Sequence, residues 1–197
     1  MGYYTTGTYP VQFSVDYPDE PLNRLSTLLR PLFIVPISVL IWAINSSASA
    51  TLFGPVLLMI LFRQKYPRWW FDWNLALLQF TLRIEVYALL MRDEYPSTDE
   101  EQAVHLDIAY PDAEQGLNRL MPLVKWFLAI PHWFVLIFLS LAAVLVAIFA
   151  WFAIIFTGKY PRGAFEFVEG VLRWQNRAVS YAFMLVTNQY PPFRLRD

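Results

Sequence analysis

Few residues of this chain have side chains suited to catalysis or metal binding. There is no cysteine, and only two of the 197 residues are histidines. This excludes thiolate zinc sites and iron–sulfur clusters and leaves too few imidazoles for a histidine metal cage. His132 is expected to cap a helix or lie at a membrane surface, and His105 to be solvated. The carboxylates cluster in turns, at 16–20 and 93–101, instead of converging on a pocket as acid–base catalysis requires. We therefore expect no catalytic residue, no metal, no cofactor and no enzymatic activity.

Basic residues are the remaining candidates for binding, and they occur at matching places in the two halves of the chain. At a membrane surface such residues bind acidic lipid headgroups. They equally form salt bridges to acidic turns, for example to Asp19 or Glu85, and this second interpretation is slightly favoured. The eight candidates are Arg24, Lys65, Arg68, Arg83, Arg119, Lys159, Arg162 and Arg177.

Aromatic residues make up 18% of the chain, and several lie beside basic residues where the chain leaves its apolar stretches. Trp and Tyr prefer the headgroup layer of a membrane, because the ring is apolar while its N–H or O–H stays hydrated. Stacking on nucleic-acid bases needs a basic groove, which a net charge of −1 argues against. The expected interfacial anchors are Tyr66, Trp69, Trp70, Trp73, Trp126, Trp133, Tyr160 and Trp174.

The composition is that of a membrane protein. Hydrophobic residues make up 57% of the chain and charged residues 16%, with a mean hydropathy of +0.38. Soluble domains are roughly 45–50% apolar and about 25% charged. The N-terminal tail, residues 1–10, lacks the basic and apolar pattern of a secretory signal, so membrane insertion is expected to depend on a later segment.

The chain contains an internal repeat. The letters LNRL at 22–25 recur at 117–120, and KYPR at 65–68 recurs at 159–162. The offset between matching residues stays between 93 and 95 throughout, so the two halves align almost without gaps. The predicted divisions are a tail at 1–10, a first membrane module at 11–96, an acidic linker at 97–103 and a second membrane module at 104–197.

Each module is predicted to contain the same elements in the same order. Alternating apolar and polar residues, from Val11 and from Val104, predict a short strand, and the two strands could pair as a small cap. The stretches 31–62 and 126–158 contain no charged residue. A single helix of that length is about 45 Å long, against a hydrocarbon core of about 30 Å. We therefore expect a membrane hairpin in each module, turning at 45–49 and near 140–143.

An amphipathic helix is predicted to close each module. In the second copy charged and small residues follow one face at helical spacing, and Glu169 and Arg173 are placed to pair at i,i+4. The first copy, over 79–86, also alternates with period two, and the second copy decides for a helix. Such a helix fits a membrane interface and a packed core about equally well. The expected fold is therefore mainly α: about four membrane helices, two interfacial helices and a small β cap.

The basic residues also predict a topology. They flank both uncharged stretches and are missing from the expected hairpin tips, which favours an even number of crossings. Both termini and the linker are then cytoplasmic, while 45–51 and the region near Ser140 approach the opposite face.

The second half carries a series of short motifs: Ile130-Pro131-His132, Gly158-Lys159-Tyr160-Pro161, Arg173-Trp174, Arg177, Tyr181 and Tyr190-Pro191-Pro192-Phe193. These motifs resemble those of a bacterial membrane family known as domain of unknown function 4389, and the resemblance extends to both halves. The first half departs from the pattern, because Ile37 stands where the histidine is expected and Gln64 where the glycine is expected. The resemblance implies a membrane location and no settled activity.

The sequence favours a non-catalytic integral protein of the bacterial cytoplasmic membrane, acting as an accessory or scaffold subunit of a larger membrane assembly. The alternative is a lipid-binding or lipid-handling protein that uses the cleft between the two modules. The expected partners are membrane lipids, together with other membrane proteins or further copies of this chain. Nucleic acid is not expected as a partner.

Overall fold

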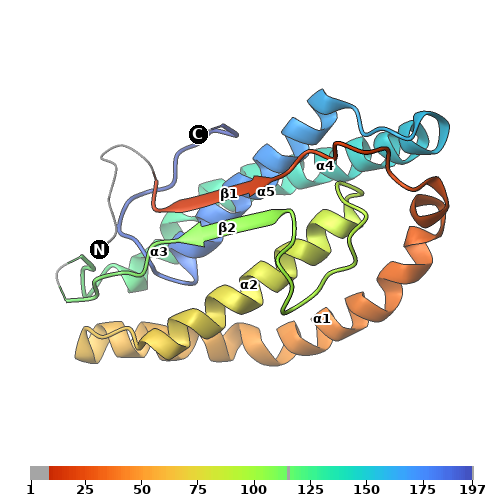
Figure 1. Cartoon of the computed structure of the whole chain (residues 1–197). Coiled ribbons are helices and arrows are strands. Elements are labelled where there is room, and N and C mark those ends of the chain that lie inside the picture. Colours follow the sequence, from red (N-terminus) through yellow and green to blue (C-terminus); the bar gives the residue numbers. More distant parts are fainter. Residues whose placement is uncertain (1–8, 115, 197) are drawn as a thin grey trace.

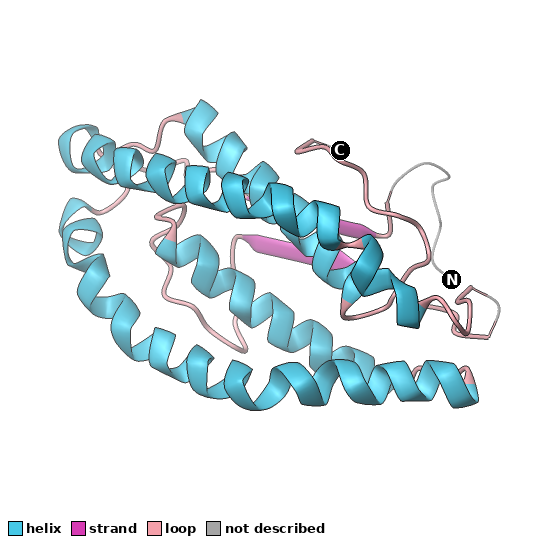
Figure 2. Cartoon of the chain, turned by 180° about the vertical axis from the view of Figure 1, so that it is seen from behind, coloured by secondary structure: helices cyan, strands magenta, loops and turns pink. Residues whose placement is uncertain are grey.

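The protein is mainly helical and is built in three layers (Figure 1). The computed structural model describes residues 9–114 and 116–196, without the side chains of 40–53, so most of the predicted N-terminal tail lies outside the described residues. A two-stranded sheet lies on one side, α2 and α5 lie beneath it, and α1 and α4 form the opposite side (Figure 2). The elements are β1 (Val11–Val15), α1 (Arg24–Leu58) with a final π-helical turn η1 (Met59–Arg63), α2 (Arg68–Ala88), β2 (Val104–Ile108), α3 (Pro122–Leu128), α4 (Ile130–Thr157) and α5 (Arg162–Ala182).

The two predicted strands are confirmed, and they pair with each other. β1 and β2 are antiparallel, and Phe13 lies opposite Leu106 at the centre of the register. These two residues occupy matching positions in the sequence repeat, so the centre of the sheet lies on a twofold axis that relates the two halves. The apolar side chains of both strands face the helices, while the residues between them, such as Ser14 and His105, are exposed.

Each strand packs on the helix of the other half. Arg173 of α5 donates from Nε to the Phe13 carbonyl at 2.9 Å, and Gln79 of α2 donates from Nε2 to the Leu106 carbonyl at 3.1 Å. Because Gln79 and Arg173 are equivalent in the repeat, one contact is made twice, in opposite directions. The Val15 amide also donates to Oε1 of Glu169, at 3.2 Å.

Two tyrosines that follow the strands repeat this exchange. The Tyr17 hydroxyl donates to the Tyr160 carbonyl at 2.5 Å, and the Arg162 guanidinium lies 4.7 Å from the Tyr17 ring. In the other direction, the Tyr110 hydroxyl donates to the Tyr66 carbonyl, and a guanidinium lies 4.8 Å from the Tyr110 ring. The repeated Tyr-Pro and Lys-Tyr-Pro-Arg motifs therefore join the two halves.

The expected membrane hairpins are wrong. Helix α1 continues for 35 residues through 45–49, and α4 continues for 28 residues through 140–143. Ser and Asn cost a helix only some tenths of a kcal/mol each, and 140–143 contains neither Gly nor Pro. The chain turns instead at left-handed residues, Gln64 after α1 (φ 46°) and Gly158 after α4 (φ 75°).

The predicted number of membrane helices is also wrong. Among the described residues one helix, Ile130–Thr157, is long and apolar enough to cross a membrane, and Gly54–Arg63 is a shorter apolar helix. The expectation of about four membrane helices and two interfacial helices does not hold. The closing amphipathic segments are helices, as predicted, but α5 lies in the core with twelve of its residues buried.

The crossed tyrosines allow a stability test. Tyr17→Phe and Tyr110→Phe each remove one O–H donor and leave a carbonyl without its partner, so each is expected to lower the free energy of unfolding by about 1 kcal/mol. Because the two contacts are equivalent, the losses should agree. Unfolding followed by near-ultraviolet circular dichroism in one detergent measures both.

Tyr95→Phe is the matched control, since Tyr95 is exposed and its hydroxyl makes no hydrogen bond within the described structure. Losses no larger than that of the control would show that the two contacts do not hold the halves together.

Candidate functional site

An open groove lies between the first turns of α1 and the second half of α4. Its volume is about 500 Å³. Both halves of the chain form this groove, because α1 belongs to the first half and α4 to the second. The lining is almost entirely apolar, and its residues are Arg30, Pro31, Ile34, Ala88, Leu89, Leu90, Val144, Ala147, Ile148 and Trp151.

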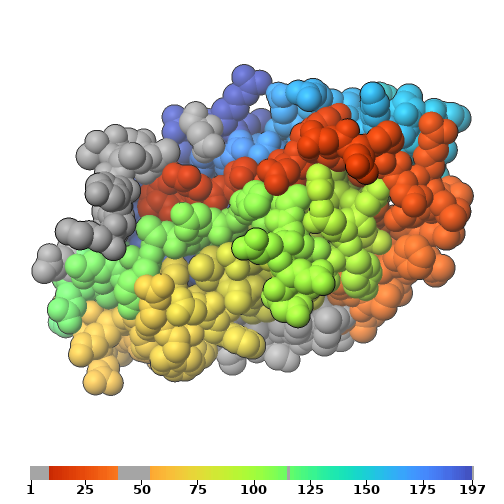
Figure 3. All heavy atoms as spheres, in the orientation of Figure 1, coloured from red at the N-terminus to blue at the C-terminus, as the bar shows by residue number. Residues whose placement is uncertain are grey.

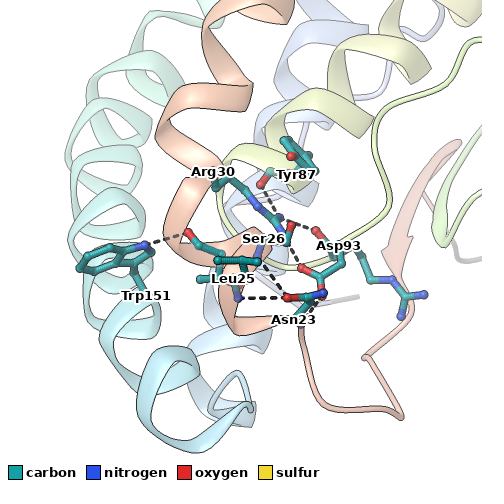
Figure 4. Close-up of polar contacts among 9 residues, drawn as sticks. Asn23, Leu25, Ser26, Arg30, Tyr87, Asp93 and Trp151 are labelled. Carbon is teal, nitrogen blue, oxygen red and sulfur yellow. Dashed lines mark hydrogen bonds and ion pairs between the residues drawn. The ribbon is translucent and has the colours of Figure 1, made fainter.

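One residue of this lining is a buried arginine, Arg30, which is 1% exposed. Its Nη1 donates to the carbonyls of Tyr87 at 3.0 Å and Arg92 at 2.6 Å, and its Nη2 forms an ion pair with Asp93 (Figure 4). The guanidinium also lies 4.2 Å from the Tyr87 ring. The protein itself therefore compensates this charge.

The start of α1 holds Arg30 in place. Oδ1 of Asn23 accepts from the amides of Leu25 at 3.0 Å and Ser26 at 3.1 Å, which caps the helix. The backbone N–H of Asn23 donates to Oδ2 of Asp93 at 2.6 Å, so one carboxylate binds both the helix start and Arg30. Across the groove, Trp151 donates from Nε1 to the Thr27 carbonyl at 3.0 Å, as Figure 4 shows.

The eight basic candidates fall into two groups. Four are engaged within the protein: Arg68 pairs with Asp72 at 3.1 Å, and Arg83, Arg162 and Arg177 contact backbone carbonyls or tyrosine rings. Neither Asp19 nor Glu85 forms an ion pair among the described residues. The other four are exposed and form no ion pair in this part of the chain: Arg24, Lys65, Arg119 and Lys159.

The expected aromatic anchors also divide. Trp69, Trp73 and Trp126 are exposed, in accord with an interfacial position. The other five are partly or fully buried, and Tyr66, Tyr160 and Trp174 lie in the core. Their place in the sequence beside basic residues did not distinguish the two groups, since Trp69 is exposed whereas Tyr66, three residues earlier, is buried.

His132 is neither a cap nor a surface residue. It is fully buried, and its Nδ1 accepts from Nε1 of Trp174 at 2.9 Å. Its ring stacks on Phe193 at 4.0 Å and lies 4.8 Å from Tyr190. Three motifs that are distant in the sequence therefore meet in one aromatic cluster, which no pattern within a single motif predicted.

Comparison with known proteins gives one match. Residues 119–194 match the family model described as a domain of unknown function, DUF4389. The match supports this family. It covers a single copy, not two, and it contains the whole cluster around His132. No curated protein and no solved structure matches the chain.

One buried carboxyl group connects the two inner helices. Glu85 of α2 accepts from Nε2 of Gln175 in α5 at 3.5 Å, and its Oε2 has no hydrogen-bond partner among the described residues. Burial raises the pKa of Glu85 to about 7, against an opposing effect of the Gln175 hydrogen bond. The carboxyl is therefore largely protonated in the folded protein at mildly acidic pH.

Glu85→Gln tests this state. Because the folded pKa of about 7 lies above the ordinary value of 4.5, the wild type loses stability as pH rises between these values. A glutamine at this position mimics the protonated form, so the variant should be more stable than wild type at pH 8, by up to about 3 kcal/mol. The difference should vanish near pH 4.5.

Unfolding measured across this pH range in one detergent gives the comparison. Glu166→Gln, at an exposed position of α5, is the control and should leave the pH dependence unchanged. A stability difference for Glu85→Gln that does not vary with pH would contradict the raised pKa.

Proposed function

We propose that this protein is a non-catalytic membrane protein that binds lipid in the groove between α1 and α4. The observation that carries the proposal is the groove itself, which is apolar, open and formed by both halves. Its volume of about 500 Å³ lies within the range of small-molecule sites, about 300–1,000 Å³.

The polar groups beside the groove indicate the class of ligand. The Nη atoms of Arg30 are occupied by two carbonyls and Asp93, and Nε1 of Trp151 is occupied by Thr27. A polar ligand would find few partners there, so a hydrocarbon chain suits the groove best. The exposed apolar side chains of α4 next to it, among them Phe149 and Phe152, support a supply of such chains from a surrounding membrane.

The second candidate is an accessory or scaffold subunit of a larger membrane assembly. It is favoured by the many large apolar side chains that α1, α3 and α4 expose, which another protein could cover. Detergent-purified protein that runs reproducibly as a lone monomer, with no co-purifying partner, would count against this role.

The repeat and the location are part of the proposal. We propose that residues 11–96 are a second, diverged copy of the matched domain, since Tyr17 and Tyr110 make equivalent contacts in opposite directions. The bacterial cytoplasmic membrane is the proposed location. Both termini are placed on its cytoplasmic side, because basic residues flank both uncharged stretches and basic flanks favour the cytoplasm.

Filling the groove tests lipid binding. Ile148→Trp places an indole at its lining, and native mass spectrometry of the full chain in a mild detergent measures the retained phospholipid. We expect wild type to retain lipid and Ile148→Trp to bind it about tenfold more weakly, which corresponds to about 1.4 kcal/mol.

Ile137→Trp is the matched control, because Ile137 is exposed on the same helix and does not line the groove. Equal retention by wild type and Ile148→Trp, or no retained lipid in wild type, would refute binding in the groove.

A further inference from the structure

The side of the molecule formed by α1, α3 and α4, here called the apolar layer, exposes large hydrophobic side chains at many of its described positions. The stretches 31–62 and 126–158 contain no charged residue. On α4 the exposed residues recur at every turn, and their exposed fractions reach 75% at Phe156. The exposed set on α4 is Ile130, Phe134, Ile137, Phe138, Leu141, Val144, Leu145, Ile148, Phe149, Phe152 and Phe156.

The opposite side of the molecule is polar. There the outward residues of the sheet, among them Gln12, Ser14, Asp16, His105 and Asp107, are exposed. This is the side that faces the viewer in Figure 3, where β1 (red) and β2 (green) lie at the surface. One side of the protein thus suits hydrocarbon and the other suits water.

Helix α4 does not stand apart from the rest of the protein as a membrane crossing would. Helix α5 lies along most of α4 (Figures 1 and 2). Tyr181 packs with Ala129, Trp174 donates to His132, and Leu136 packs with Trp174 and Ala178. If α4 crossed a bilayer, α5 and the sheet would have to enter it alongside, carrying the exposed Glu166. A charged residue at the centre of a bilayer is strongly disfavoured.

The four exposed basic candidates that form no ion pair among the described residues lie at the two ends of the apolar layer. Arg24 lies next to Gly158, the residue before Lys159, at the junction of α1 and α4. The segment between η1 and α2, which contains Lys65, and the start of α3, which follows Arg119, lie toward the other end (Figure 1). A crossing α4 would place these two pairs on opposite sides of the membrane, whereas a flat α4 keeps all four at one level.

We propose that α1 and α4 lie flat in one leaflet of an anionic phospholipid bilayer, with the twofold axis of the sheet along the membrane normal. That axis passes between Phe13 and Leu106, perpendicular to the strands. It therefore relates Arg24 and Lys159 to Arg119 and Lys65 at equal depth, where they bind acidic headgroups. This inference rests on the proposed function only in taking a membrane as the protein's environment.

Depth measurements along α4 test the orientation. The chain has no cysteine, so single cysteines at Phe134, Leu145 and Phe156 carry a fluorescent label without background. These residues are 11 apart in the sequence, about three turns, so they share one face. The full chain is reconstituted in vesicles of equal parts phosphatidylcholine and phosphatidylglycerol, and quenchers at known depths in the lipid report each label's position.

A flat helix gives three equal depths. A crossing helix places the Leu145 label about 16 Å along the helix from each of the other two, at the bilayer centre, with the ends near opposite surfaces. That second pattern would overturn the proposal. A label at Ser14, on the sheet, should stay in water and serves as the control.

Charge removal tests the role of the basic ends. Arg24→Gln with Lys159→Gln should weaken association of the full chain with the same vesicles by roughly tenfold to thirtyfold. In vesicles of phosphatidylcholine alone this difference should disappear. Arg194→Gln with Arg196→Gln removes two exposed charges from the C-terminal segment, which packs on α5, and should cost less. Equal losses for the two double variants would refute specific headgroup contacts.

The two proposals fail separately. If the three depths differ while Ile148→Trp still retains less lipid than wild type, the flat orientation is overturned and lipid binding in the groove stands. Equal depths with full lipid retention in Ile148→Trp would overturn the groove and leave the orientation standing.

Discussion

The pairing of β1 with β2 at Phe13 and Leu106 is the interaction on which the rest of the structure depends. A two-stranded ribbon is at best marginally stable in water by itself. Here each strand is covered by the helix of the other half, and Arg173 and Gln79 bind its carbonyls. Separating the halves would uncover both strands at once, so neither half keeps its sheet without the other.

The same exchange explains which motifs the repeat retains. Tyr17 and Tyr110 each reach the carbonyl before a proline in the other half, and an arginine lies over each ring. A motif that looks like a turn signal within one half is therefore a contact between halves. Local sequence reasoning recognised the repeat but could not assign this role, because the partner lies more than 40 residues away along the chain.

The elements that the sequence predicted well are those with a regular period. Alternation predicted both strands, and helical spacing predicted α5, which in turn decided α2. The hairpins were predicted wrongly because the length of each uncharged stretch was compared with the thickness of a bilayer, and a helix lying flat has no such limit. A cleft between the two modules was considered from the sequence, but its lining could not be predicted, since Arg30 and Trp151 come to line one groove only through the packing of α1 on α4.

The two halves differ in how they neutralise a buried cation. Arg30 and Lys125 are equivalent buried cations, and each lies over a tyrosine ring, Tyr87 or Tyr181. Arg30 has the carboxylate of Asp93, whereas Lys125 donates to the Thr187 carbonyl at 2.7 Å, and burial lowers its pKa to about 8.

The surroundings of the two buried cations differ as well. The second half fills the space beside Lys125 with the cluster of His132, Trp174, Tyr190 and Phe193, which closes that end of α4. The first half has Ile37 in place of the histidine. Near Arg30 the two long helices instead leave an open apolar groove. In the proposed arrangement a lipid chain has access at one end of the apolar layer, and the basic residues at both ends hold the layer level in the membrane.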